Sequence, residues 1–243
     1  MEQVKVEGLS YAYDKAKALR NISFSVEKGS CVCIAGANGS GKSTLLELLA
    51  SCMKPSSGSI TIGGVSLSEE SAGYKTGLVF QNPDNQFFMP SVWEDVAFGI
   101  MKKGVPPEAG RERALRALRM AGAEHLAARA PYRLSGGEKQ RVAIASILIM
   151  ENEVLLLDEP TASLDPRARR NIITLIKGLD RTRIIASHDL DMILDIAGRV
   201  IFLHNGELSA QSPVPGLLLD EGYLQSIGLE LPLGRALPPW TSR

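Results

Sequence analysis

The chain has 243 residues, and its 27 Lys and Arg residues balance its 27 Asp and Glu residues to give a formal net charge of zero. This balance argues against a protein that binds a nucleic-acid backbone, because such proteins carry an excess of basic side chains. No apolar run approaches the roughly 20 residues of a membrane-spanning helix, and charged residues near Met1 replace the apolar core of a signal peptide, so we expect one cytosolic domain.

Two segments near the N-terminus alternate between apolar and polar residues, as half-buried strands do. Val4 and Val6 share one face of the first segment, and Ile22 and Val26 share one face of the second. Residues 58–65 (GSITIGGV) predict another short strand. We therefore expect a small antiparallel sheet beside the rest of the domain.

A glycine-rich loop follows a predicted strand at Cys31–Ala35 and precedes a leucine-rich helix. It matches GxxxxGK[ST], whose glycines let the backbone curl until its N–H groups point at phosphate oxygens. Lys42 supplies a charge for the β and γ phosphates and Ser43 a hydroxyl for Mg²⁺, at roughly 1.5–3 kcal/mol for each charge-assisted contact. The surrounding strand and helix disfavour the alternative, an ordinary turn. The predicted ATP-binding residues here are Gly36, Ala37, Asn38, Gly39, Ser40, Gly41, Lys42, Ser43 and Thr44.

The middle of the chain changes character and predicts a mostly helical insertion, which we place at about residues 82–150. Ser91 and Glu94 have the spacing of a capping box at the start of one helix. Pro107 opens a second helix, which is rich in Arg, Ala and Leu.

A continuous apolar strand at Val154–Leu157 ends in two carboxylates, Asp158 and Glu159. A buried strand of this kind delivers its first carboxylate to the Mg²⁺ shell, which is the form of a Walker B element. Glu159 is then free to polarise the attacking water. The alternative is a strand ending in a solvated acidic turn, which the phosphate loop disfavours. Further along, residues 183–187 predict another buried strand and residues 205–206 (NG) a hairpin turn.

The segment Leu134–Arg141 (LSGGEKQR) lies between the phosphate loop and the acidic strand. Small residues, a hydroxyl and exposed N–H groups at a helix start form an anion site, although a plain capped helix start also fits this segment taken alone. With the other two motifs, the segment resembles the signature sequence of the ABC ATPase family. This resemblance implies a P-loop α/β fold with a mainly parallel core sheet, an antiparallel β subdomain and a helical insertion. It also implies that Ser135, Gly136 and Gly137 contact the γ-phosphate of ATP bound to a second subunit.

Three further positions match motifs of the family in the expected order, although each would be weak alone. Gln81 corresponds to the Q-loop glutamine, which reaches Mg²⁺ and water. Asp165 ends the D-loop at the dimer interface, whereas alone it would be an ordinary N-cap before Pro166. His188 matches the switch histidine, which holds the γ-phosphate and the water.

Tyr13 is expected to stack on the adenine ring, because an aromatic face offers a π contact while the phosphates supply most of the affinity. Tyr11 is the rival, since alternation puts both side chains on one face of a strand. The choice of Tyr13 comes from the spacing in the family.

Residues 80–86 (FQNPDNQ) point to one branch of the family, because they are similar to the FQNPDxQ segment of energy-coupling factor ATPases. Members of this branch are the motors of vitamin and cobalt or nickel uptake. Residues 224–232 (LQSIGLELP) look like that family's segment just after the core. We expect an ABC ATPase domain at 1–212 and a short C-terminal tail at 213–243, where the family usually continues further.

The resemblance also implies partners and a location. The ATPase would pair with a copy of itself or a related chain, beneath a transmembrane coupling protein that carries a substrate-binding membrane protein. It would therefore be peripheral at the cytoplasmic face of the membrane, with ATP and Mg²⁺ as its cofactors.

Three other functions share some of these sequence features. The chain would also fit the motor of another ABC importer branch. A non-transport ABC ATPase acting on DNA or ribosomes is disfavoured, because we find no long coiled coil and no second domain with a basic linker in the sequence. A P-loop kinase or GTPase would explain Lys42 and Asp158 but leaves Gln81, His188 and the signature segment without a role.

Overall fold

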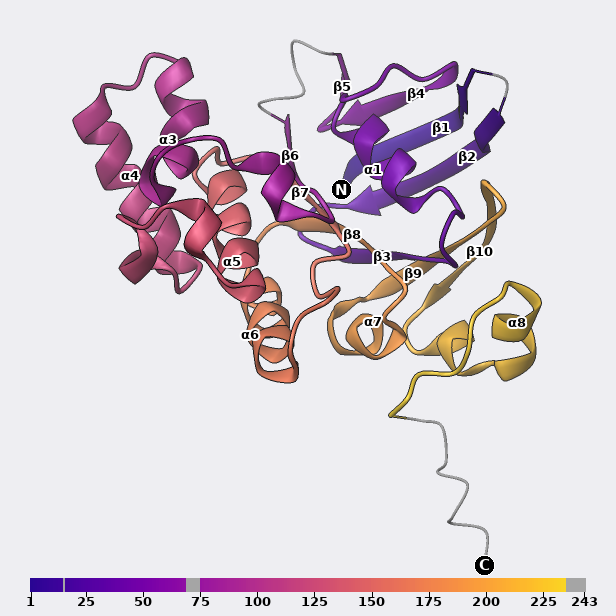
Figure 1. Cartoon of the computed structure of the whole chain (residues 1–243). Coiled ribbons are helices and arrows are strands. Elements are labelled where there is room, and N and C mark those ends of the chain that lie inside the picture. The colour runs from indigo at the N-terminus through magenta and orange to yellow at the C-terminus, as the bar shows by residue number, and fades with distance from the viewer. Residues whose placement is uncertain (15, 69–74, 235–243) are drawn as a thin grey trace, which may run out of the picture.

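Two β-sheets and a projecting group of helices make up the structure (Figure 1). This computed structural model describes residues 1–14, 16–68 and 75–234. One sheet is antiparallel, the other is mainly parallel, and the helical group extends from one edge of the parallel sheet. The arrangement confirms the predicted α/β fold with its antiparallel β subdomain and helical insertion.

The N-terminal strands form an antiparallel sheet in the order β2-β1-β4-β5. Val4 lies opposite Val26, and both are buried, as the apolar alternation predicts. The segment predicted as one strand at 58–65 is instead a hairpin, because Gly63 and Gly64 adopt positive φ angles and turn the chain. The strands are β1 (Glu2–Tyr13), β2 (Ala16–Glu27), β4 (Ser57–Ile62) and β5 (Val65–Ser66).

The second sheet of the described chain has six strands in the order β10-β9-β3-β8-β7-β6. All its pairings are parallel except that of β9 with β10, which meet in the predicted hairpin at residues 205–206. Because parallel strands end at the same edge, the residues after β3, β6, β7 and β8 gather there. The bounds are β3 (Cys31–Ala35), β6 (Thr76–Val79), β7 (Val154–Asp158), β8 (Thr182–Ser187), β9 (Arg199–His204) and β10 (Glu207–Pro213).

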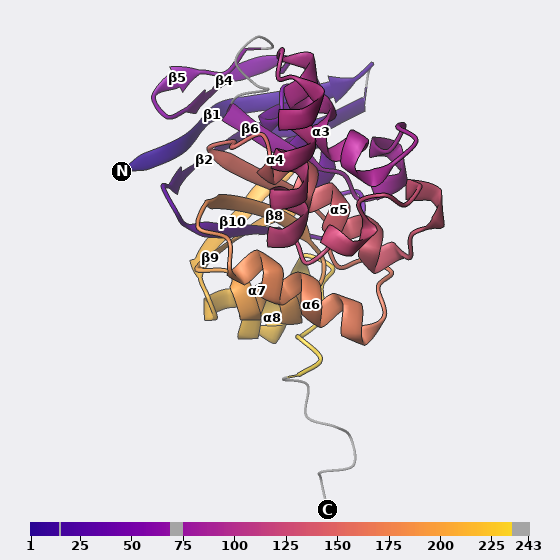
Figure 2. The same cartoon turned by 90° about the vertical axis from the view of Figure 1, so that its left-hand side faces the viewer.

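Helices cover both faces of the parallel sheet. Helix α1 (Lys42–Leu49) lies between the two sheets, where its leucines are buried against strands of both. Helices α6 (Pro166–Lys177) and α7 (Leu190–Ile196) pack on the opposite face (Figure 2) and complete a second apolar cluster. The sheet is therefore buried on both sides, which explains why its strands are continuously apolar.

The projecting group contains α3 (Val92–Lys102), α4 (Pro107–Met120) and α5 (Gly136–Leu148), which share an apolar cluster of their own. Helix α4 begins at Pro107, as predicted. Ser91 is the N-cap of α3, but its hydroxyl donates to the Glu94 carboxylate and caps no backbone N–H group, so the predicted capping box is not formed in full. None of the helices in the described segments combines the length and apolar composition of a bilayer-spanning helix.

The segment after β10 returns to the main core. It contains the short helices η4 (Gly216–Leu219) and α8 (Glu221–Ser226), and Leu218 and Leu224 are buried in the same cluster as α6 and α7. The N–H groups of Leu233 and Gly234 each donate to the Asp191 carboxylate on α7 at 2.9 Å. The proposed boundary at 212 falls within the last strand, and residues 235–243 of the proposed tail lie outside the described residues.

Candidate nucleotide site

A cavity of about 850 Å³ opens where the phosphate loop leaves β3. The residues that line it come from segments far apart in the sequence, including the loop itself, the acidic strand end and the segment after β6. The structure thus brings most of the predicted ATP-binding residues together. The lining residues predicted from the sequence are Tyr13, Asn38, Gly39, Gly41, Lys42, Ser43, Thr44, Gln81 and Glu159.

Two glycines of the phosphate loop stand where no side chain fits. A Cβ atom on Gly36 would lie 2.4 Å from the Leu203 carbonyl oxygen, and one on Gly41 would lie 2.7 Å from Leu19. Gly41 also has a φ of 103° and is the N-cap of α1, so no side chain caps the first turn of this helix. The N–H groups of that turn remain available to an anion, as phosphate binding requires.

Lys42 is buried beside the loop that it serves, and its side chain is only 6% exposed. Its ammonium donates to the carbonyl oxygens of Gly36 at 2.9 Å and Ala37 at 3.2 Å. The Glu159 carboxylate lies 3.7 Å away, close enough for an ion pair. These contacts hold the charge at the floor of the cavity, in position to meet phosphate oxygens.

Asp158 is the last residue of β7, next to Glu159, and its buried carboxylate is a candidate metal ligand. Burial raises the pKa of its carboxyl, and a hydrogen bond with Ser43 opposes that rise. Its Oδ1 atom is buried without a hydrogen-bond partner, which is costly for a carboxylate unless a cation or water satisfies it. The described residues contain no group of three His, Cys, Asp or Glu side chains that could hold a metal ion, so a cation here would also need oxygen ligands of other kinds, such as the Ser43 hydroxyl.

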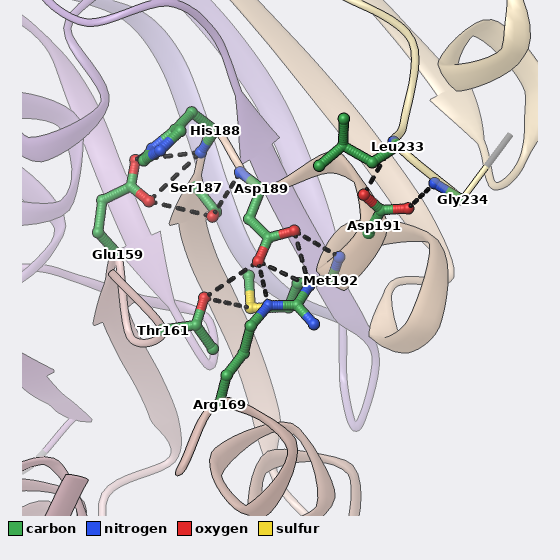
Figure 3. Close-up of polar contacts among 10 residues, drawn as sticks. All are labelled: Glu159, Thr161, Arg169, Ser187, His188, Asp189, Asp191, Met192, Leu233 and Gly234. Carbon is green, nitrogen blue, oxygen red and sulfur yellow. Dashed lines mark hydrogen bonds and ion pairs between the residues drawn. The ribbon is translucent and has the colours of Figure 1, made fainter. Parts of the chain in front are cut away.

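The end of β8 and the residue after it hold the carboxylate of Glu159, the residue that the sequence predicts to polarise the attacking water (Figure 3). Its Oε1 atom lies 2.8 Å from His188 Nδ1 and accepts the His188 N–H at 3.1 Å, and its Oε2 atom accepts the Ser187 hydroxyl at 3.1 Å. A buried carboxylate requires such partners. Glu159 also has a φ of 44°, an uncommon value for a residue with a side chain, and this conformation turns the chain sharply after β7.

Tyr13 and Tyr11 are neighbours on one face of β1, with ring centroids 4.9 Å apart. Tyr13 is 47% exposed at the rim of the cavity, and its hydroxyl is 3.4 Å from Thr44 Oγ1. Tyr11 instead packs against the apolar cluster around α1. The structure therefore places Tyr13, and not its rival, at the cavity.

Part of the cavity wall is not predicted from the sequence, including Lys17, Arg20 and Asn205. Arg20 lies at the cavity because the backbone of β2 meets the β9–β10 hairpin, where the Arg20 N–H donates to the Gly206 carbonyl at 2.8 Å. No local sequence pattern predicts these residues as part of the site, because it is the packing of the two sheets that brings them to the cavity.

The signature segment lies away from this cavity. Gly136 lines a different one, of about 330 Å³, together with Gln81 and with Ser163 and Leu164 of the D-loop. Ser135 starts α5, and the Glu138 carboxylate accepts both its N–H and its hydroxyl at 2.8 Å. Asp165 caps α6 by accepting the N–H groups of the next turn. Within the described part of the chain, the signature residues are thus not among those that line the phosphate-loop cavity.

Comparisons with known proteins identify relatives of this chain. The profile of the ABC transporter family matches residues 19–162. The energy-coupling factor transporter ATP-binding protein EcfA of Methanothermobacter thermautotrophicus is 43% identical over 94% of this chain and 76% of its own length. The structure of CbiO1 from Clostridium perfringens, part of the ABC transporter complex CbiONQ, has a TM-score of 0.81 and 36% identity over 94% of this chain and 95% of that one.

A second structure is informative about assembly and ligand. The ATP-binding cassette MJ0796, in a dimeric post-hydrolysis state bound to ADP and Pi, has a TM-score of 0.78 and 31% identity over 88% of this chain and 99% of that one. Sequence and structural similarity both extend over nearly the whole chain. The chain therefore belongs to the ABC transporter family.

Proposed function

We propose that this chain is the ATP-hydrolysing subunit of an energy-coupling factor importer for a vitamin or a transition-metal ion. The identity with EcfA supports this branch, as does the similarity to CbiO1, whose complex is a transporter. The FQNPDNQ segment supports it independently from the sequence. The chain would act at the cytoplasmic face of the membrane, through partners that cross the bilayer.

The proposal assigns roles to residues in and beside the cavity. ATP lies in the cavity with its adenine on Tyr13 and its phosphates on Lys42 and the first turn of α1. Mg²⁺, which neutralises phosphate charge, would be held by Ser43, Asp158 and Gln81. These are hard oxygen donors, and the unpartnered Oδ1 of Asp158 fits such an ion.

Hydrolysis requires a water positioned in line with the γ-phosphate. Glu159 polarises this water, and its burial beside Lys42 and His188 fixes the direction of its carboxylate. His188 orients Glu159 through two contacts, from its backbone N–H and from Nδ1. The exposed part of the His188 ring lines a neighbouring cavity that Glu159 also borders, and we expect the ring to reach the γ-phosphate from that side.

One observation carries the proposal of a paired enzyme. The phosphate loop and the signature segment line separate cavities of the same chain, and Gln81 borders both. A single chain therefore presents two half-sites, one for the phosphates and one for an anion arriving from outside. Two chains facing each other would complete two nucleotide sites, with the phosphate loop of one chain against the signature of the other.

Mixing two inactive variants tests this arrangement. Lys42→Ala removes the phosphate contact and Ser135→Arg blocks the signature, so each variant alone should lack hydrolysis. A mixed pair contains one site with both halves intact, and ATPase activity should reappear on mixing. Activity that stays absent, in mixtures shown by crosslinking to contain mixed pairs, would overturn the shared site.

The membrane partners are proposed to dock near the FQNPDNQ segment. This segment contains η1 (Pro83–Gln86) and contacts the signature helix through an ion pair of 2.6 Å between Asp84 and Lys139. Movement of a partner there would thus be passed to α5. Purification of the tagged chain from membranes, followed by mass identification of every protein retained, should recover a coupling protein and a substrate-binding membrane protein; recovery of neither would contradict the proposal.

A further inference from the structure

An ion pair with no assigned role connects the helix after the D-loop to the segment of the switch histidine. Arg169, in the first turns of α6, donates from Nε and Nη2 to the two carboxylate oxygens of Asp189, at 2.7 and 2.8 Å. Asp189 is the residue directly after His188. The two side chains are 29% and 22% exposed, so the pair is better shielded than an ordinary surface ion pair. Its fork geometry fixes the orientation of both groups.

The pair is the far end of a hydrogen-bond chain that reaches Glu159 (Figure 3). The Asp189 N–H donates to the Ser187 hydroxyl oxygen at 3.0 Å, and that hydroxyl donates to Glu159 Oε2 at 3.1 Å. The Asp189 carboxylate also caps α7 by accepting the Met192 N–H at 2.9 Å. Asp189 thus fixes the backbone on the far side of His188, while Ser187 and His188 contact the catalytic carboxylate.

Asp189 stays ionised in this setting. Burial by itself would raise the pKa of the Asp189 carboxyl, but the hydrogen bonds from Arg169 and from the Met192 N–H outweigh burial and hold the pKa below its ordinary value. The charge of Arg169 is therefore matched at neutral pH, and the link between α6 and α7 is a charge-assisted one.

We propose that Arg169 and Asp189 are positioning residues for ATP hydrolysis, which hold Ser187 and His188 in the geometry that directs Glu159 at the attacking water. This inference rests on the proposed function, and it adds a physical connection between the D-loop and Glu159. Arg169 lies one turn after Asp165, which ends the D-loop and caps α6. A displacement of the D-loop by a partner chain would therefore be carried by α6 to Arg169, and from there to the segment that holds Glu159.

A purely structural role, as a clip between α6 and α7, is the competing explanation. The chain supplies its own control, because Lys177 and Asp195 form a second ion pair between the same two helices. That pair spans 3.8 Å, is about half exposed, and joins the C-terminal ends of the helices, away from Glu159. If such pairs only hold the two helices together, both pairs should matter alike. If the proposal is right, only the Arg169–Asp189 pair should affect the position of Glu159.

The test compares steady-state ATPase kinetics and ATP binding for Arg169→Gln, Asp189→Asn, the double variant and the control Lys177→Gln. Asparagine remains a good N-cap, so Asp189→Asn should keep α7 intact while losing the charge. We expect kcat to fall about tenfold or more in both single variants, with KM and ATP affinity changed less than about twofold. The double variant should be no slower than the slower single variant, because one linkage is lost in each case. Lys177→Gln should keep the kcat of the unmodified chain.

Arg169→Lys sharpens the result. Lysine keeps the charge but not the fork, so kcat should recover only in part relative to Arg169→Gln. The inference is overturned if Arg169→Gln keeps full kcat, if its loss appears in KM alone, or if Lys177→Gln loses as much. An unmodified chain without any ATPase activity, by contrast, would count against the proposed function and not against this linkage.

Discussion

The starts of helices α1 and α5 are two candidate anion sites. Both are helix N-termini, but they differ in the N-cap residue and in the charged side chain beside it. Both follow small residues, and both present unpaired N–H groups of a first helical turn. Helix α1 has Gly41 as its N-cap and Lys42 buried beside it, so its donors and its charge serve the cavity. Helix α5 has Ser135 as its N-cap, and Glu138 accepts the Ser135 hydroxyl.

From this difference we infer that the α1 site can bind phosphate by itself and that the α5 site cannot. The α1 site combines a positive side chain with backbone donors, whereas the α5 site places a carboxylate at its entrance. To bind a phosphate oxygen, the Ser135 hydroxyl must turn away from Glu138. We infer that the α5 site contributes only when a nucleotide is already bound to a facing chain.

The largest effect should come from breaking the α1 site with Lys42→Ala. Loss of a charge-assisted contact to each of two phosphates, at roughly 1.5–3 kcal/mol apiece, should weaken ATP binding at least about 100-fold. Isothermal titration calorimetry on the isolated chain measures this directly. Lys177→Ala removes a comparable charge far from the cavity and should leave affinity unchanged. Retention of ATP affinity within about tenfold would contradict the role of Lys42.

Glu159→Gln should separate binding from chemistry at the same site. With its amide oxygen in the place of Oε2, glutamine can still accept the Ser187 hydroxyl at 3.1 Å and the His188 N–H at 3.3 Å. It cannot serve as a base, so hydrolysis should fall about 100-fold or more while ATP stays bound. The ATP-loaded variant should accumulate as a dimer on size-exclusion chromatography with light scattering. Normal turnover in this variant would show that Glu159 does not have this role. Glu153→Gln provides a matched control at a partly buried glutamate that does not line the cavity.

Ser135→Ala should slow hydrolysis about tenfold or more without changing the ATP affinity of the isolated chain, because its hydroxyl serves a facing chain. Ser91→Ala is the matched control, since Ser91 also starts a helix and bonds to a glutamate three residues later. Equal ATPase rates in the two variants would count against a catalytic role for the α5 site.

The sequence predicts the α1 site better than the rest of the cavity, for a physical reason. A phosphate loop is local: strand, glycines, lysine and helix follow each other within about one βα unit, so pattern alone locates Lys42 and Ser43. Asp158 is equally predictable, because a buried parallel strand must end at the same edge as β3. By contrast, Lys17 and Asn205 line the cavity only through packing between the two sheets.

Two other features lay beyond the reach of sequence patterns. The contact between Glu159 and His188 joins residues 29 positions apart, and it depends on the parallel register of β7 and β8. The segment 58–65 is predicted as one strand although it forms a hairpin, because Gly63 and Gly64 are compatible with either a strand or a turn. In both cases the outcome depends on contacts between segments distant in the sequence, which a local pattern does not contain.

The smallest effect concerns the carboxylate that distinguishes the α5 site. The hydrogen bonds from the Ser135 N–H and hydroxyl hold the pKa of Glu138 below its ordinary value. A group of this kind stabilises the fold above its unfolded pKa, about 4.3, and the stabilisation is lost as pH falls through the lower folded pKa. Glu138→Gln should therefore lower the free energy of unfolding at pH 7 by less than about 1 kcal/mol, since the site is partly solvated.

That difference between Glu138→Gln and the unmodified chain should remain constant from pH 7 to about 5 and shrink below about pH 4. Urea unfolding at a series of pH values measures it. A difference that stays the same down to the acid limit of folding would mean that the charge of Glu138 is not what stabilises the start of α5. Size-exclusion chromatography of the ATP-loaded variant adds a second measurement: if Glu138 competes with phosphate for the Ser135 hydroxyl, its neutral replacement should not reduce the ATP-driven pairing of two chains.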